Sequence, residues 1–321
     1  MASRPLDRAF ALEAVRVTEA AAIAAARFIG RGDEHAADHA AVEAMRTTFN
    51  ILPIDGTVVI GEGERDEAPM LYIGEKVGTG GVAVDIALDP LEGTTLTAKA
   101  ASNALAVMAL AEPGTLLNAP DTYMDKIAIG SGYPDGIIDL DADPAENILA
   151  LAKFKDVHPR EITACILDRP RHESIIAAVR GIGASVHLIT DGDVAGVIAT
   201  TDPATGIDIY IGRGGAPEGV LAASALRCVG GQFQARLHFR SEDEKQRALK
   251  LGITDFNRKY SLKEMARGDV IFAATGVTDG TMLQGVHKSG EFIFTHSIMM
   301  RSSTGTVRWI KARHRRSKYE C

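Results

Sequence analysis

The chain has 321 residues, of which 46% are hydrophobic and 24% are charged, as in globular proteins of one or two domains. Its formal net charge is −7, which argues against general binding to nucleic acids or anionic membranes because such binding needs a basic surface. Three scattered cysteines are too few for a disulfide framework or a thiolate zinc site, so a cytoplasmic location is expected.

The first half of the chain predicts two helices and then a sheet. The helices are expected over residues 6–29 and 34–49, with Asp33 as the N-cap of the second. Strands follow at 57–60, 71–73, 82–88 and 104–109. Their close spacing predicts an antiparallel sheet with flanking helices. The longest apolar run, 104–111, falls well short of the ~20 residues that cross a bilayer.

From about residue 160 the pattern becomes that of alternating strands and helices. Strands are predicted at 163–167, 186–189 and 207–211, and helices at 174–180, 194–199 and 219–228. This is typical of a doubly wound α/β sheet, whose functional loops lie at the carboxyl ends of the strands. The predicted fold class is therefore α/β, with an α+β domain at 1–158 and an α/β domain at 159–321. A helix-rich charged segment at 240–263 and a further strand at 270–274 complete the prediction.

Acidic residues stand where ordinary surface charges are not expected. Asp38 shares a helical face with Val42, Met45 and Phe49, so it either serves a site or complements the helix dipole. Two predicted strands are followed directly by acids, in Gly61-Glu62-Gly63-Glu64 and in Asp89-Pro90-Leu91-Glu92-Gly93-Thr94. Clustered carboxylates repel one another unless cations neutralise them, and oxygen-rich sites select Mg²⁺ or Mn²⁺.

The predicted second domain carries further candidates, each with an alternative interpretation. Glu218 is either a metal ligand or an acid in the first turn of a helix. Arg169 and Arg171, around Pro170, either bind phosphate or form an exposed basic loop. Asp191-Gly192-Asp193 either holds sugar hydroxyls or forms a plain turn, and Tyr123 either donates to a phosphate or packs in the core.

The hexapeptide at 89–94 resembles the motif of the lithium-sensitive, Mg²⁺-dependent sugar and inositol phosphatases. Glu92 stands where that motif usually has aspartate. Together with Ile60-Gly61-Glu62-Gly63-Glu64, Glu67-Ala68-Pro69-Met70-Leu71-Tyr72, Asn118-Ala119-Pro120-Asp121 and Gly214-Gly215-Ala216-Pro217-Glu218-Gly219, it resembles class II fructose-1,6-bisphosphatase nearly end to end. The resemblance implies the layered α-β-α-β-α sugar phosphatase fold.

It also implies a function and a set of site residues. The expected reaction is hydrolysis of the 1-phosphate of fructose 1,6-bisphosphate with Mn²⁺ or Mg²⁺, with sedoheptulose 1,7-bisphosphate as a second candidate substrate. Thr94 would orient the attacking water, with Asp66 as its acidic partner. The implied metal ligands are Asp38, Glu62, Asp89, Glu92 and Glu218. The implied substrate contacts are Glu92, Gly93, Thr94, Tyr123, Arg169, Pro170, Arg171, Asp191, Gly192, Asp193 and Gly215.

Two alternatives remain open at this stage. One is another phosphatase of the superfamily, acting on inositol phosphate or a nucleotide 3′-phosphate. The other is a non-catalytic metal-binding or nucleic-acid-binding protein, raised by the basic segment 308–318, which we interpret as a solvated end or strand edge. We expect a small sugar bisphosphate as partner, no nucleic acid, no membrane, and a homo-oligomer that is a dimer or a tetramer.

Overall fold

The computed structural model describes residue 6 and residues 8–63 and 70–319. These residues form two compact units, the first made of residues 1–116 and 268–321 and the second of residues 117–267. The boundary predicted near residue 158 lies inside the second unit, and the last strands of the chain belong to the first. This division differs from the predicted one because strands distant in sequence pair within one sheet.

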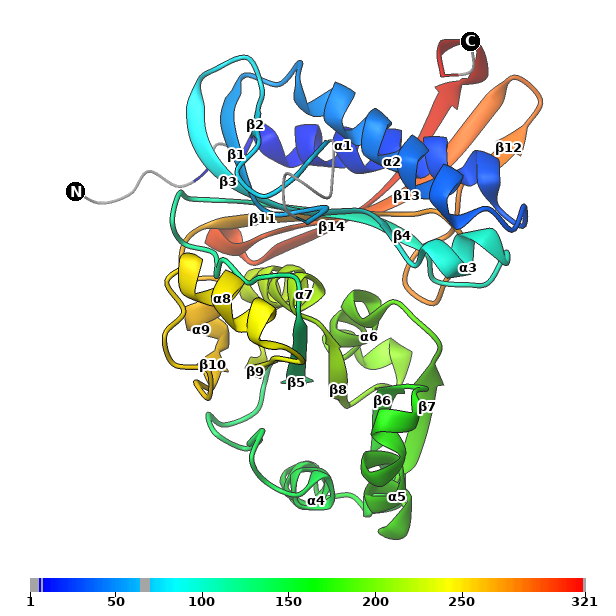
Figure 1. Ribbon diagram of the computed structural model, residues 1–321. Coiled ribbons are helices and arrows are strands. Elements are labelled where there is room, and N and C mark those ends of the chain that lie inside the picture. The colour runs from blue at the N-terminus through cyan, green and yellow to red at the C-terminus, as the bar shows by residue number, and fades with distance from the viewer. Residues whose placement is uncertain (1–5, 7, 64–69, 320–321) are drawn as a thin grey trace. The chain divides into compact units, whose positions relative to one another are not determined.

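The first unit contains a mixed sheet with helices α1 (Phe10–Ala25) and α2 (Glu34–Phe49) across one face (Figure 1). Its described strands follow the order β12-β13-β11-β4-β3-β1-β2, with β14 paired to β13. These strands are β1 (Ile54–Ile60), β2 (Lys76–Val77), β3 (Val82–Glu92), β4 (Leu105–Ala111), β11 (Val270–Gly276), β12 (His287–Ser289), β13 (Phe292–Arg301) and β14 (Thr306–Arg315).

Helix α2 has the predicted bounds, and its start and packing follow from its sequence. The Asp33 side chain accepts a hydrogen bond from the Ala36 N–H at 2.9 Å, which confirms the predicted N-cap. On the face of α2 that points away from solvent, Met45 and Phe49 are fully buried in the core of the first unit. The apolar face formed by Val42, Met45 and Phe49 therefore packs the helix against the sheet, where α2 contacts β3.

Two expectations for this unit were wrong. Residues 71–73 form a turn rather than a strand, because Leu71 has a positive φ of 55° and its N–H donates to the Glu75 carboxylate. The sheet is not purely antiparallel, since β1 and β3 run parallel. The basic segment lies largely in β14, which pairs along its whole length with β13, in agreement with a strand edge.

The second unit is built on a sheet of order β10-β9-β5-β8-β6-β7 among its described strands. Strands β7, β6 and β8 run parallel, and β5, β9 and β10 add antiparallel pairs. The strands are β5 (Tyr123–Ile129), β6 (Thr163–Leu167), β7 (Ser185–Ile189), β8 (Ile209–Gly215), β9 (Gln232–His238) and β10 (Tyr260–Ser261). The predicted strand–helix alternation after residue 160 is confirmed.

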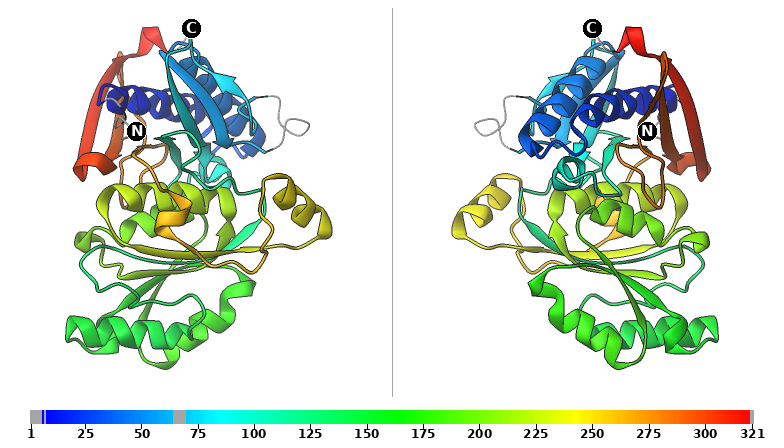
Figure 2. Two further views of the ribbon diagram at one scale, coloured as in Figure 1. Left: turned by 90° about the vertical axis from the view of Figure 1, so that its left-hand side faces the viewer. Right: turned by 90° about the vertical axis from the view of Figure 1, so that its right-hand side faces the viewer.

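Helices cover both faces of this second sheet. Figure 2 shows α4 (Pro144–Lys155) and α5 (Glu173–Gly181) on one side, and α7 (Ala216–Val229) on the other together with α6 (Asp193–Ala199). The charged segment forms α8 (Glu242–Lys250) and α9 (Leu262–Met265), so it is helix-rich as predicted. Both units combine helices with mixed sheets, which confirms the α/β fold class.

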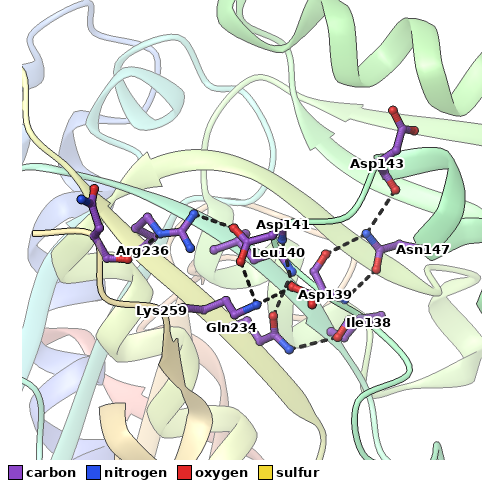
Figure 3. A network of polar contacts seen from close by, with 10 residues as sticks. Ile138, Asp139, Leu140, Asp141, Asp143, Asn147, Gln234, Arg236 and Lys259 are labelled. Atoms are coloured by element: carbon purple, nitrogen blue, oxygen red, sulfur yellow. Dashed lines mark hydrogen bonds and ion pairs between the residues drawn. The ribbon is translucent and has the colours of Figure 1, made fainter.

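A polar network ties the connection between β5 and α4 to strand β9 (Figure 3). Arg236 on β9 binds the Asp141 carboxylate at 2.7 Å, and Lys259 reaches both Asp139 and Asp141 at 2.5 and 2.9 Å. Hydrogen bonds from Arg236 and Lys259 lower the pKa of Asp141 to about 2. The Gln234 amide adds bonds to backbone groups of the same loop. These contacts fix residues 138–141 of the loop to β9, and the Ile138 side chain also packs into the apolar core of the second unit.

Candidate active site

The end of β3 carries the two acids of the hexapeptide. Asp89 is half-buried, and Glu92 is buried with 4% of its surface exposed. Carboxylate oxygens of these two residues lie within 4.8 Å of one another. Like charges at this separation favour a bound cation, and carboxylate oxygens are the donors that Mg²⁺ and Mn²⁺ prefer. The donor set therefore fits a divalent metal ion.

Strand β3 continues through Pro90 to Glu92, beyond the end at residue 88 that the sequence predicted. Asp89 pairs with Val107 and Glu92 with Leu105, so three steps along β3 match two along β4. A proline is tolerated at such an irregularity because a bulged residue makes no ladder hydrogen bond. The bulge sets Asp89 and Glu92 close together.

A one-turn helix follows these acids. Gly93 has a φ of 90°, a left-handed conformation that favours glycine, and α3 (Thr94–Ala98) begins at the next residue. The change of direction leaves Thr94 half-buried beside Glu92 in the chain. Thr94 is therefore the first residue of the helix that follows the two acids.

The other predicted metal ligands of the first unit are placed differently. Asp38 and Glu62 are half-buried, but neither belongs to the close group at the end of β3. Burial raises the pKa of Asp38, partly opposed by His35 and His39, which are exposed. Asp66, the predicted partner of Thr94, lies outside the described residues.

In the second unit, arginines gather around Tyr123 at the start of β5. The guanidinium groups of Arg171 and Arg240 lie 4.9 and 4.5 Å from the centre of the Tyr123 ring. Arg171 also donates two hydrogen bonds to the backbone carbonyl of Arg213, at 3.1 and 2.8 Å. Fixed guanidinium groups of this kind suit an anionic ligand such as phosphate.

The loop that carries Arg169, Pro170 and Arg171 is anchored by a buried histidine. His172 is 1% exposed; its Nδ1 bonds to the Leu167 carbonyl at 2.7 Å, and its Nε2 accepts from the Arg213 N–H at 2.8 Å. The ring must therefore be neutral, with the proton on Nδ1. Burial, with smaller contributions from Arg171 and Arg213, lowers the pKa of His172 despite the opposing bond from Leu167.

The Asp191-Gly192-Asp193 segment contains one acid that is partly exposed to solvent and one that is buried. Asp191 is half-exposed, with its carboxylate 4.0 Å from Arg169. Asp193 is 5% exposed and forms an ion pair with the buried Lys126 of β5. Gly192 between them has a φ of 81° and precedes α6.

Glu218 lies in the first turn of α7, three residues after Gly215, which ends β8. A Cβ added at Gly215 would lie 1.9 Å from the Glu218 carboxylate, so this carboxylate rests against the Gly215 backbone. Glycine is therefore required at position 215 for this arrangement.

Sequence patterns did not identify Arg240 or Lys126. Arg240 follows β9, and only the pairing of β9 with β5 brings it to Tyr123. Lys126 did carry a signal, since it shares the alternation of the buried Met124 and Ala128 along β5. A charged residue on the buried face of a strand indicates a partner within the fold.

Paired carboxylates suited to divalent cations, together with an arginine-rich loop suited to phosphate, are features of metal-dependent phosphatases. The described part of the chain contains no helix of the length and apolarity required to span a membrane.

Comparison with known proteins identifies the family. The family described as bacterial fructose-1,6-bisphosphatase, glpX-encoded, matches residues 8–314. Fructose-1,6-bisphosphatase 1 class 2 of Escherichia coli (strain K12) is 46% identical over 324 residues, covering 96% of each chain. The fructose-1,6-bisphosphatases class 2 of Escherichia coli O6:H1 and Shigella flexneri have the same identity and coverage. The chain belongs to the glpX-encoded fructose-1,6-bisphosphatase family, which confirms the resemblance inferred from its motifs.

Proposed function

We propose that the protein is a metal-dependent phosphomonoesterase that hydrolyses the 1-phosphate of fructose 1,6-bisphosphate, giving fructose 6-phosphate and phosphate. The observation that carries the proposal is the close pair of carboxylates, Asp89 and Glu92, beside Thr94 in a member of this family. We place this activity in the cytoplasm, in gluconeogenesis and sugar phosphate metabolism, and expect a dimer or tetramer.

The metal ligands in this proposal are Asp38, Glu62, Asp89, Glu92 and Glu218, and the metal is Mn²⁺ or Mg²⁺. Asp89 and Glu92 form the centre of the set because their oxygens are already close and Glu92 is withdrawn from water. A divalent cation held there supplies charge neutralisation for the phosphate that reacts.

The residues of the chain then have separate tasks in the hydrolysis. The Thr94 hydroxyl accepts a hydrogen bond from the attacking water and orients its oxygen toward phosphorus, with Asp66 as acidic partner. The new P–O bond forms as the bond between phosphorus and the sugar O1 breaks; the attacking water gives up one proton and O1 takes one up, so that the reaction balances. Glu92 and Gly93 contact the phosphate from the bulge and the turn of β3.

The second phosphate and the sugar are assigned to the second unit. Arg169 and Arg171 bind the 6-phosphate, with the hydroxyl of Tyr123 as a further donor. Support comes from the Arg171 guanidinium, which two bonds to the Arg213 carbonyl hold beside the Tyr123 ring. The half-exposed Asp191 accepts from sugar hydroxyls, and Pro170, Gly192, Asp193 and Gly215 shape these loops.

A second phosphate subsite favours a sugar bisphosphate over an inositol monophosphate. Sedoheptulose 1,7-bisphosphate presents the same reacting end, so it is a second candidate substrate. The non-catalytic alternative loses its basis, because the basic segment is a paired strand rather than a separate binding arm.

The test is phosphate release by the purified protein from fructose 1,6-bisphosphate and inositol 1-phosphate, with Mn²⁺, with Mg²⁺, and with excess EDTA. We expect metal-dependent release from the sugar bisphosphate alone. Release from inositol 1-phosphate instead would keep a metal-dependent phosphatase but overturn the substrate, and no release from either would overturn the enzyme.

A matched pair of variants tests the site itself. Glu92→Gln keeps the shape of the side chain but removes its charge, and turnover should fall by roughly 100-fold or more if the carboxylate binds the metal. Glu43→Gln makes the same change at an exposed position of α2 and should behave as the wild type. Wild-type turnover by a folded Glu92→Gln protein would contradict the assignment.

A further inference from the structure

A buried lysine lies beneath the turn that leads into α7. Lys126 is 1% exposed, and its ammonium group forms an ion pair with the Asp193 carboxylate, which is 5% exposed. The same ammonium donates to the Gly215 carbonyl at 2.8 Å. The hydroxyl of Tyr210 donates to Asp193 at 3.2 Å. Lys126 thus connects β5, α6 and the last residue of β8.

The end of β8 and the start of α7 pack closely against this lysine at two glycines, Gly214 and Gly219. A Cβ added at Gly214 would lie 2.0 Å from the Asp193 carboxylate and 3.0 Å from the Lys126 ammonium. A Cβ added at Gly219, in the first turn of α7, would lie 3.3 Å from Cδ of Lys126. The aliphatic stem of Lys126 therefore runs under the first turn of α7, and its charged end holds the residue before that turn.

Stability alone does not account for this ion pair. Removing two charges from water is costly, and apolar replacements of buried ion pairs are often neutral or stabilising. What the pair does supply is a fixed geometry, because an ammonium group with two oxygen partners holds the Gly215 carbonyl in one place. The Glu218 carboxylate rests on that same Gly215.

We infer that Lys126 and Asp193 are positioning residues for Glu218. They fix the backbone against which the Glu218 carboxylate lies, so that this carboxylate is held ready as a metal ligand. The inference rests on the proposed function, in which Glu218 binds a divalent metal. It also gives Asp193 an internal role, in which its carboxylate acts through Lys126 rather than by contacting the sugar.

The experiment compares Mn²⁺ binding by the full-length wild type and by Lys126→Met, using isothermal titration calorimetry without substrate. Loss of groups that orient a ligand weakens metal binding by about 10- to 100-fold. We expect a shift of that size in the variant, and the same shift in the Mn²⁺ concentration for half-maximal phosphate release. The KM for fructose 1,6-bisphosphate at saturating Mn²⁺ should change by less than about threefold, because the side chains proposed to bind the 6-phosphate and the sugar, Arg169, Arg171 and Asp191, are unchanged.

A second variant covers the case in which an unpaired buried carboxylate prevents folding. Lys126→Met combined with Asp193→Asn removes both charges and still removes the donor to Gly215, so it should fold and bind Mn²⁺ about tenfold more weakly. The matched control is Lys155→Met, which breaks the ion pair with Asp208 just before the start of β8, away from the turn. The control should bind Mn²⁺ as the wild type does.

The outcomes separate the inference from the function on which it rests. Wild-type Mn²⁺ affinity in the folded double variant overturns the positioning role and leaves the proposed function standing. A raised KM with unchanged Mn²⁺ affinity also overturns it, because Asp193 would then contact the sugar directly. Absence of Mn²⁺ binding and of phosphate release in the wild type overturns the proposed function and this inference with it.

Discussion

His172 joins the arginine loop to strand β8, and replacing it with phenylalanine should loosen both. Phenylalanine keeps a ring in the buried space but leaves the Leu167 carbonyl and the Arg213 N–H without their partner. Each orphaned buried group costs about 1–3 kcal/mol, so the unfolding free energy should fall by roughly 2–6 kcal/mol. At about 2–4 °C per kcal/mol, the melting temperature should fall by at least about 4 °C.

The same residue should make the stability depend on pH. Burial holds the folded-state pKa of His172 below its ordinary value, so only the unfolded chain binds a proton as the pH falls through about 6.5. The contribution of His172 is therefore fully present above the unfolded pKa and is lost as the pH falls toward the folded pKa. His172→Phe should remove this part of the acid sensitivity.

The assay is thermal unfolding followed by circular dichroism at pH 8 and pH 5.5, for the wild type, His172→Phe and His187→Phe. His187 is exposed on β7 and provides the control for exchanging a histidine. An unchanged melting temperature in His172→Phe would refute the hydrogen-bond argument. If the melting temperature of His172→Phe fell between pH 8 and pH 5.5 by as much as that of the wild type, the titration argument would be refuted.

Three further predictions concern turnover, substrate binding and the core. Thr94→Ala should lower kcat by roughly 100-fold with KM within a few-fold, since orienting water matters mainly in the transition state; unchanged kcat in steady-state assays would remove Thr94 from the mechanism. Arg171→Ala should raise the KM for fructose 1,6-bisphosphate by about 10- to 100-fold, but not that for fructose 1-phosphate, and equal effects on both would contradict a 6-phosphate contact. Phe49→Ala should cost about 3–5 kcal/mol of unfolding free energy, measured with urea, because the ring is fully buried between α2 and the sheet; a loss below ~1 kcal/mol would contradict this packing.

Local signals in the sequence predicted local structure well. The apolar stripe and the Asp33 cap predict α2 from Glu34 to Phe49 without error, because both act within one helix. The segment at 71–73 misled because three apolar residues meet the pattern of a strand, whereas Glu75 binds the Leu71 N–H and holds a turn. At Pro90 the error was the reverse: the predicted strand stopped at residue 88, whereas β3 continues to Glu92 because a bulge accommodates the proline.

Contacts between distant segments were beyond the reach of such signals. The placement of Arg240 beside Tyr123 depends on the pairing of β9 with β5, and the domain division depends on the pairing of β4 with β11. For the site, Asp89 and Glu92 were expected as metal ligands, and the structure places their carboxylate oxygens within 4.8 Å of one another. The roles of all five expected ligands, Asp38, Glu62, Asp89, Glu92 and Glu218, stay predictions that the metal titrations address.

The pairing of β4 with β11 has a consequence for the synthesis of this protein. Every residue of β4 is buried in the finished fold, yet its neighbour β11 follows only after residues 117–267. At about 5–20 residues per second, a ribosome needs roughly 8–30 s to translate that interval. During this time an apolar strand edge, the kind of surface that pairs with other chains, stands open on the nascent polypeptide. Chaperone dependence during expression is therefore expected to centre on the first unit, and the second unit can fold before the first is complete.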